Sequence, residues 1–324
     1  MKKGIAALAL GGALTAGAAY GALAFAGDLL FKRDCVPPAE FTEKLVDCDK
    51  AHLGDYLQKN LQWVESYGYD RHFMLSDRGE RLVGYHLKPE KESKIFVFAA
   101  HGYRSYGKKE FCGVGQYYIE KGYNLFMVDH VASGESEGTY CTFGYNETKD
   151  CLKWLSYMIE TFGEDIKIIL HGVSMGAATV MLMNGSGLLP ENVKMTVADC
   201  GFTSGPEFFA YRVNMFSKAI PAKGLVKAWN KVNKGRTGFD LFEVEPIKAV
   251  ERAEKPMLFI HGEQDGLVPC FMVYELYESC ASREKELVVI GGADHAQSYM
   301  VGKEKYTEKL GSFIDSHIDS EVLI

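Results

Sequence analysis

Residues 166–183 read IKIILHGVSMGAATVMLM, and this stretch decides the fold. An apolar run, Ile166 to Leu170, precedes two glycines that flank Ser174, and a second apolar run begins at Ala177. The pattern predicts a strand that enters a tight turn and continues as a helix. The glycines relieve crowding in such a turn, and the strained serine between them lifts its hydroxyl clear of the sheet. That position suits attack on a carbonyl carbon.

Short apolar runs alternate with helical stretches on both sides of this turn. Six of these runs are candidate parallel strands: Ile95–Ala99, Asn124–Val128, Ile166–Leu170, Val193–Val197, Met257–Ile260 and Leu287–Ile290. Strands that are buried on both faces read as continuous apolar runs, as these do. A hairpin pattern over residues 72–87 adds two antiparallel strands. The sequence therefore predicts a doubly wound α/β fold, with a mostly parallel central sheet flanked by helices.

One gap between strands is longer than a crossover needs. About fifty residues separate Phe202 from Glu254, where a single helix would need far fewer. The segment is rich in aromatic residues and is interrupted by prolines and glycines. We therefore expect a small helical cap, at about residues 203–254, over the C-terminal ends of the strands. Some of its aromatic side chains are expected to pack within the cap, and a few to face the substrate.

The first 33 residues differ in character from the rest of the chain. Two lysines precede residues 4–26, an uncharged stretch made mostly of Ala, Gly and Leu. This stretch is long enough to span a bilayer, and it also has the basic start, apolar middle and small-residue site of a signal peptide. The apolar run extends beyond that site to Lys32 and Arg33, which favours a retained anchor. Basic residues at both ends do not determine on which side of the membrane the chain lies. The alternative to an anchor or a signal peptide is a buried helix within the domain.

Composition and charge narrow the class of protein. The 324 residues are 47% hydrophobic with a formal net charge of −7, which argues against a nucleic-acid partner. The eight cysteines show no metal-ligand spacing, so we expect no metal and read them as core residues, with pairing left open. We expect a linker with short helices over residues 34–70 and one α/β domain, including the cap, over residues 71–324.

A serine nucleophile needs a base, and the base needs an acid that fixes its tautomer. His295 is the candidate base, because it follows the last predicted strand in a flexible loop. Asp265 is the candidate acid, because it lies just beyond the preceding strand, with Asp199 and Asp294 as alternatives. Three other histidines precede glycines at strand ends and are expected to pack or to brace loops: His101, His171 and His261.

Charge that develops on a substrate oxygen needs fixed hydrogen-bond donors. The backbone amide of Met175, at the start of the predicted helix, is one candidate donor. The amide of Tyr103, in the loop after the first parallel strand, is the other. Met175 and Tyr103 therefore form the predicted oxyanion hole. Tyr103 could donate through its hydroxyl instead of its amide, and the sequence leaves this choice open.

Five segments together resemble the α/β-hydrolase superfamily, in the bacterial branch described as serine aminopeptidase-like or lysophospholipase-like. They span residues 70 to 310 and are His101–Tyr103, Asp129–Gly138, Gly172–Gly176, His261–Pro269 and Asp294–His295. The order Ser174, Asp265, His295 is that of the superfamily. Glu135 stands where the family usually has a second glycine, in a loop whose role is structural. The resemblance implies hydrolysis of an ester, thioester or amide without a metal or organic cofactor.

These observations predict a serine hydrolase that cleaves an acyl bond through an acyl-enzyme. A carboxylic ester is favoured as substrate, because an aromatic cap suits an apolar acyl or alcohol part. An aminopeptidase-like serine peptidase is the first alternative; it would need a site for a charged peptide terminus, and Glu207, Glu243 and Glu245 are candidates. A non-catalytic binding module is the second. We expect a small-molecule acyl substrate and the membrane as partners, with the chain anchored by its N-terminal helix or exported.

Overall fold

An eight-stranded sheet forms the centre of the molecule in the computed structural model, which describes residues 18–34 and 50–318. The strand order is β1-β2-β4-β3-β5-β6-β7-β8. β1 (Asp70–Leu75) and β2 (Arg81–Leu87) form an antiparallel hairpin, and β2 also runs antiparallel to β4. All other pairs are parallel, and their strands are β3 (Ile95–Ala100), β4 (Asn124–Asp129), β5 (Lys167–Val173), β6 (Val193–Asp199), β7 (Met257–Gly262) and β8 (Lys285–Ile290).

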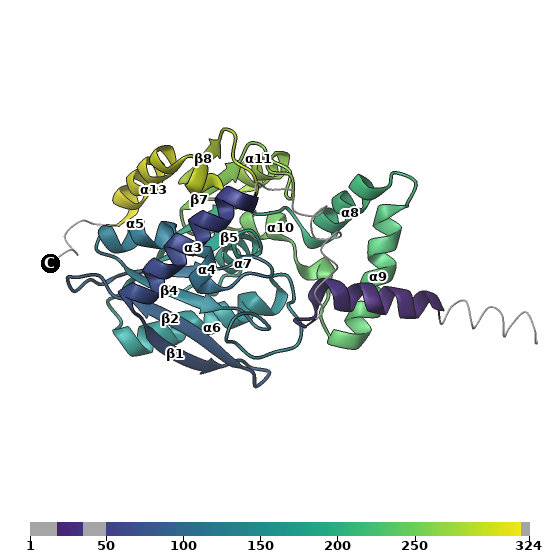
Figure 1. The fold of residues 1–324 in the computed structure, drawn as a ribbon, viewed down its shortest axis with the longest axis horizontal. Helices are drawn as coiled ribbons and strands as arrows, with labels where there is room; N and C mark the ends of the chain where they lie inside the picture. The colour runs from purple at the N-terminus through teal and green to yellow at the C-terminus, as the bar shows by residue number, and fades with distance from the viewer. Residues whose placement is uncertain (1–17, 35–49, 319–324) are drawn as a thin grey trace, which may run out of the picture.

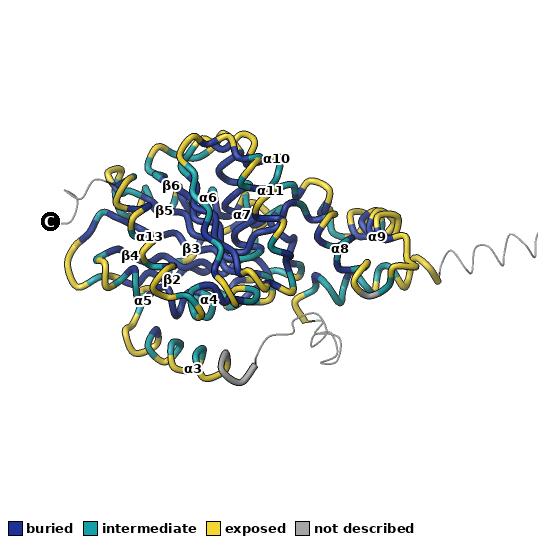
Figure 2. The backbone as a smooth tube through the Cα atoms, turned by 90° about the horizontal axis from the view of Figure 1, so that it is seen from above, coloured by how far each residue is buried: buried dark blue, intermediate teal, exposed yellow. Residues whose placement is uncertain are grey.

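Helices cover both faces of this sheet (Figure 1). One face is packed by α3 (Lys50–Tyr67), α5 (Val114–Glu120) and α13 (Lys303–His317), with the short α4 (Gly107–Glu110) and α12 (Ser298–Val301) nearby. The other face is packed by α6 (Tyr145–Phe162), α7 (Met175–Asn184), α10 (Pro246–Val250) and α11 (Phe271–Ser279). Figure 2 shows the strands as the buried centre. The predicted α/β architecture is confirmed.

A helical cap interrupts the α/β pattern between β6 and β7. It contains α8 (Gly205–Phe216), α9 (Ala222–Thr237) and the 3-10 turn η1 (Leu241–Glu243). Figure 1 shows α8 and α9 at the end of the molecule away from the sheet. Buried aromatic residues of the cap and of neighbouring loops form one cluster: Phe143, Phe202, Phe208, Trp229 and Phe239. Most cap aromatics therefore pack against one another. This agrees with the expectation that aromatic side chains pack within the cap.

Residues 18–31 are helical and pack on this cap. Phe31 is only 2% exposed and stacks on Trp229 with ring centroids 5.1 Å apart. Asp28 forms an ion pair with Arg236 at 2.9 Å. None of the helices in residues 18–34 and 50–318 is long and apolar enough to cross a membrane. The predicted anchor or signal over residues 1–33 thus finds no support in its described part, which packs on the cap, and residues 1–17 lie outside the described residues.

Six of the cysteines lie in the described residues, and each is a free thiol. Five are buried and Cys270 is partly exposed. Their positions agree with the expectation of small core residues. Cys35 and Cys48 lie outside the described part of the chain.

Candidate active site

The turn at Ser174 joins β5 to α7 and places the serine backbone at φ 56° and ψ −114°. Two close approaches explain the flanking glycines. A Cβ at Gly172 would lie 2.1 Å from the carbonyl oxygen of Gly176, and a Cβ at Gly176 would lie 1.9 Å from that of Ala100. Side chains at either position would collide with backbone that cannot yield. The Ser174 amide donates to the Asp199 carbonyl at 2.8 Å, which ties the turn to β6.

Three side chains from separate loops meet at the carboxyl ends of the strands. The Ser174 hydroxyl lies 2.8 Å from Nε2 of His295. The other ring nitrogen of His295, Nδ1, lies 2.8 Å from Oδ2 of Asp265. The loops follow β5, β7 and β8, which lie within the run of four parallel strands β5-β6-β7-β8, so the sheet itself brings them together. The structure therefore places all three sequence-predicted side chains in one hydrogen-bonded chain.

The Asp265 carboxylate is held from both sides. Oδ1 accepts hydrogen bonds from the amides of Leu267 at 2.9 Å and Val268 at 2.8 Å. Oδ2 also lies 3.2 Å from Nε2 of His261. Burial alone would raise the pKa of Asp265, but the adjacent His295 and the hydrogen bond from His261 outweigh it and hold the pKa well below its ordinary value. The carboxylate is thus ionised and fixed in direction.

The pKa of His295 is shifted in the opposite direction from that of Asp265. Burial disfavours its charged form, but the Asp265 carboxylate outweighs burial and raises the pKa of the imidazole. With Nδ1–H donated to Asp265, Nε2 is left as the acceptor that faces the Ser174 hydroxyl. This tautomer can take a proton from the serine, and the nearby carboxylate stabilises the imidazolium that results.

The two alternative acids have other roles. The carboxylate of Asp199 accepts a hydrogen bond from the Tyr306 hydroxyl at 3.0 Å, and burial raises its pKa to about 6. Oδ1 of Asp294 accepts from the amide of Gly266 at 2.9 Å and from that of His295 at 2.6 Å. Asp294 therefore joins the loop of Asp265 to the loop of His295.

The remaining strand-end histidines have packing or loop-bracing contacts, in agreement with the expectation. His101 Nδ1 donates to the Gly102 carbonyl at 2.7 Å, and its Nε2 accepts from the His130 amide at 3.0 Å. His171 lies between the hydroxyls of Tyr118 and Tyr306, at 2.8 Å and 3.2 Å. His261 does more than the sequence indicated, because it also holds Asp265.

The loop with Tyr103 lies against the serine turn. A Cβ at Gly102 would lie 3.3 Å from Cβ of Ser174, so the backbone of this loop passes directly beside Ser174. The Tyr103 hydroxyl donates to the carbonyl of Leu30 and accepts from Nε of Arg104 at 2.7 Å. That hydroxyl is engaged with the N-terminal helix. The Met175 amide begins α7, where the first N–H groups have no intrahelical acceptor.

Glu110, at the end of α4, was missed by the sequence analysis. Its Oε2 accepts a hydrogen bond from the Gly102 amide at 3.1 Å and so fixes the loop that carries Tyr103. No motif signals this residue, because its partner lies eight positions away across a turn and a short helix. A glutamate in that setting reads as an ordinary surface residue.

The loop over residues 129–138 is held from within, in agreement with its expected structural role. Asp129 accepts from the amides of Gly107 at 2.8 Å and Glu135 at 2.7 Å. Gly134 has φ +53°, and a Cβ there would lie 2.0 Å from Oδ2 of Asp129. Glu135, the departure from the family pattern, points outward to Arg71 at 3.3 Å. It does not reach the serine turn.

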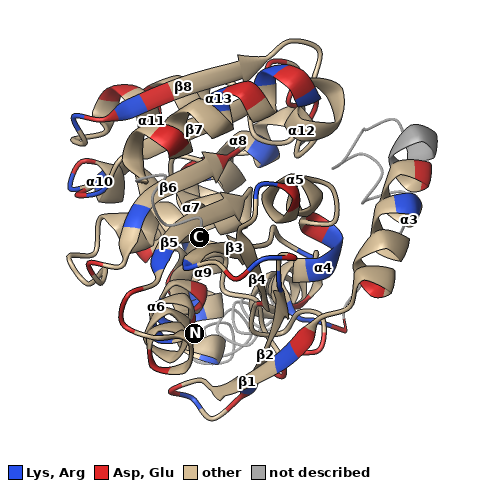
Figure 3. Cartoon of the chain, turned by 90° about the vertical axis from the view of Figure 1, so that its left-hand side faces the viewer, with Lys and Arg blue, Asp and Glu red and all other residues tan. Residues whose placement is uncertain are grey.

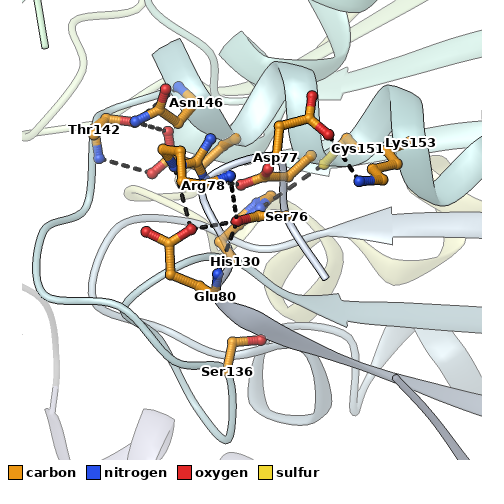
Figure 4. A network of polar contacts seen from close by, with 12 residues as sticks. Ser76, Asp77, Arg78, Glu80, His130, Ser136, Thr142, Asn146, Cys151 and Lys153 are labelled. Carbon is orange, nitrogen blue, oxygen red and sulfur yellow. Dashed lines mark hydrogen bonds and ion pairs between the residues drawn. The ribbon is translucent and has the colours of Figure 1, made fainter. Parts of the chain in front are cut away.

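Polar contacts next to this loop join the β1–β2 turn to the start of α6 (Figure 4). Arg78 pairs with the buried Asp150 at 2.6 Å, and Ser76 donates to Glu80 within the turn. Glu147 accepts from the amides of Thr142 at 2.7 Å and Gly144 at 3.0 Å. The network fixes the first turn of α6, the helix that packs beside α7.

Cys200 lies beside Asp265 and His295. Its Sγ and one ligand atom each of Asp265 and His295 lie within 4.8 Å of one another. Burial raises the pKa of the Cys200 thiol well above its usual value, and the other two side chains already bond each other. We therefore interpret the Cys200 thiol as a neutral side chain that packs beside Asp265 and His295. The expectation that the chain needs no metal or cofactor stays a prediction.

The fold and the serine turn define an α/β-hydrolase, and the chain is a serine hydrolase. It belongs to the prolyl oligopeptidase family, whose sequence profile matches residues 111–321. The uncharacterized protein YqkD of Bacillus subtilis is 28% identical over 79% of this chain and 78% of its own. The monoglyceride lipase of Mus musculus is 24% identical over 67% of this chain and 80% of its own.

A solved structure shares the same fold. The esterase PF2001 of Pyrococcus furiosus superposes with a TM-score of 0.64 at 23% identity, covering 80% of this chain and 93% of its own. The superfamily expected from the sequence is confirmed by the family match and by this likeness.

Proposed function

We propose that this chain hydrolyses carboxylic esters through a Ser174–His295–Asp265 triad. One observation carries the proposal: the two contacts of 2.8 Å that link the Ser174 hydroxyl to the His295 ring and that ring to the Asp265 carboxylate. Such a chain supplies a nucleophile, a base in the required tautomer and an acid that stays ionised.

The proposed reaction has two halves. His295 Nε2 takes the Ser174 proton as Oγ attacks the acyl carbon, and the amides of Tyr103 and Met175 hold the oxyanion. His295 then donates that proton to the leaving alcohol, which leaves an acyl-enzyme on Ser174. Water, activated by His295, releases the acid and restores the serine.

Esters are favoured over amides by the surroundings of the serine turn. Met175 packs in the same apolar cluster as Phe143, Phe202 and Phe208, so the wall beside the nucleophile is aromatic. Apolar surroundings of this kind suit an apolar acyl or alcohol group. The names of two similar proteins, a monoglyceride lipase and an esterase, point the same way.

A peptidase is the second candidate, because the chain belongs to a family named for an oligopeptidase. The acids expected to bind a peptide terminus are engaged locally or lie on the surface. Glu207 accepts from the Thr203 hydroxyl at 2.6 Å, and Glu245 pairs with Lys248 at 2.7 Å. Glu243 is exposed in η1. A peptide terminus would have to displace these contacts, which favours the ester.

Initial rates on p-nitrophenyl acyl esters of varied chain length, beside aminoacyl anilides, test the proposal. We expect ester turnover, labelling of Ser174 by a fluorophosphonate, and loss of both in Ser174→Ala. Anilide turnover well above ester turnover would overturn the substrate class. An unlabelled serine in folded protein would overturn the triad and favour the non-catalytic module.

We also propose that the N-terminal segment attaches the chain to a membrane, with residues 18–33 as its folded end. The support is the uncharged composition of residues 4–26. Cell fractionation with N-terminal sequencing tests this: we expect the mature chain in the membrane fraction with its first residues retained.

A further inference from the structure

The cap carries a segment of one charge sign. The 32 residues from Phe208 to Phe239 contain seven Lys and Arg and no Asp or Glu, although the whole chain has 43 acidic and 36 basic residues. Elsewhere the two signs are mixed: Figure 3 shows acidic and basic residues interspersed on the end of the molecule opposite the cap. A local field of positive sign on an acidic protein indicates an anionic partner.

The four lysines of α9 form a stripe. Lys223, Lys227, Lys231 and Lys234 follow one another at steps of four, four and three, so they share one face of the helix, and all four are exposed. Lys234 pairs with Asp240 at 2.7 Å. For the other three no ion pair is formed with any described residue. Val226, Trp229 and Asn233 occupy the buried face of α9.

Exposed apolar side chains accompany these lysines. Met215 at the end of α8, Ile220 in the connecting loop and Leu225 at the start of α9 are 58%, 40% and 37% exposed. Single exposed apolar residues are normal. Three at one helix–helix corner, among Lys218 and Lys223, make the mixed surface with which proteins enter the headgroup region of a bilayer.

The N-terminal helix leaves the molecule at the same end. Its Asp28 and Phe31 contact α9, and its outer residues extend past α9, away from the sheet (Figure 1). Tyr20 and Phe25 on that outer part are 53% and 63% exposed. The 17 residues that precede it are uncharged apart from Lys2 and Lys3. A lipid-seeking segment and the basic surface therefore share one end of the molecule.

We propose that the outer face of the cap docks on an anionic lipid surface. The docking face consists of Met215, Ile220 and Leu225, which enter the headgroup region, with Lys218, Lys223, Lys227 and Lys231, which pair with lipid phosphates. The apolar corner favours lipid over nucleic acid or an acidic protein, because neither would cover exposed Met, Ile and Leu side chains. This proposal stands apart from the chemistry at Ser174.

Cosedimentation of the full chain with vesicles tests the proposal. The vesicles are phosphatidylcholine alone and phosphatidylcholine with phosphatidylglycerol. We expect preferential binding to the anionic vesicles that weakens with salt, and a loss of roughly tenfold or more in the triple variant K223Q/K227Q/K231Q. K59Q/K91Q/K303Q, with the same change of charge on exposed lysines of the α/β body, is expected to bind as the unsubstituted chain does.

Further variants separate the possible outcomes. Ile220→Ser with Leu225→Ser should weaken vesicle binding but leave binding to polyglutamate or duplex DNA unchanged. Ser174→Ala should bind vesicles as the unsubstituted chain does. Vesicle binding therefore tests the docking face independently of the proposed ester hydrolysis. Thermal unfolding midpoints confirm that each variant is folded. Equal binding by the two triple variants, no preference for anionic vesicles, or polyglutamate binding as tight as vesicle binding would each overturn the proposal.

Discussion

At the scale of the residue, the contact between Asp265 and His295 is expected to set the pH range in which the proposed nucleophile Ser174 reacts. The carboxylate raises the pKa of His295 above its ordinary 6.5. Only the neutral ring can accept the serine proton, so activity is present above the raised pKa and is lost as the pH falls through it. We expect the acid limb of kcat/KM on a soluble ester to lie above pH 6.5.

Asp265→Asn is the variant that isolates this effect. It removes the charge that raises the pKa and the acceptor that fixes the tautomer, so kcat should fall by roughly 10⁴. Any residual activity should show an acid limb at lower pH. An unsubstituted enzyme whose limb lies at or below pH 6.5 would contradict the assigned pairing.

Glu110 supports a second residue-scale prediction. It accepts a hydrogen bond from the Gly102 amide, and its charge also raises the pKa of His295. Glu110→Ala should lower kcat by about tenfold with little change in KM, since the loop that carries the Tyr103 amide loses its tie. Glu110→Gln keeps an acceptor, so it should retain kcat while its acid limb moves to lower pH. Equal losses in kcat for both variants would show that charge, not position, is what Glu110 supplies.

The site residues differ in how far sequence could predict them. Ser174, Asp265 and His295 each follow a strand with a clear apolar pattern, and parallel strands bring such ends together. Glu110 and the bracing role of His261 depend on contacts between loops that no spacing encodes. The sequence left the role of the Tyr103 hydroxyl open for the same reason. Its partner, the Leu30 carbonyl, lies 73 residues away in the chain.

At the scale of the element, the β1–β2 turn and α6 depend on one ion pair. Asp150 has a side chain only 4% exposed, and Arg78, 30% exposed, is its partner. Arg78→Met leaves a buried carboxylate without a cation and should lower the free energy of unfolding by about 2 kcal/mol. Lys153→Met, in the exposed pair with Asp77 of the same network, should cost about 0.5 kcal/mol or less. Urea unfolding of both variants measures the difference, and equal costs would refute a structural role for the buried pair.

Strands were the most predictable elements and the N-terminal helix the least. The predicted run Ile95–Ala99 ends one residue before the observed strand, and Leu287–Ile290 lacks only its two charged first residues. Continuous apolar runs define such strands because both faces are buried. Residues 18–31 have an equally apolar pattern, but composition cannot tell a lipid partner from a protein one, and here Trp229 supplies the partner.

At the scale of the whole molecule, residues 18–33 join the cap to the α/β body. Toward the body, the Phe31 carbonyl accepts from the Cys141 amide and the Arg33 amide donates to the Thr139 carbonyl, both at 2.9 Å. Toward the cap, Phe31 stacks on Trp229 and Asp28 pairs with Arg236. The Leu30 carbonyl also holds the Tyr103 hydroxyl, so the same segment touches the proposed oxyanion loop.

Deletion of residues 1–33 should therefore lower both stability and turnover. It exposes the aromatic cluster around Trp229, and burial of Phe31 alone is worth about 3 kcal/mol or more. We expect a lower unfolding temperature by calorimetry, separate unfolding of cap and body, and a lower kcat on a soluble ester. Deletion of residues 1–17 keeps every contact described above and is the matched control. If both truncated chains unfold at the same temperature, the segment does not hold the cap, because only the longer deletion removes Asp28 and Phe31.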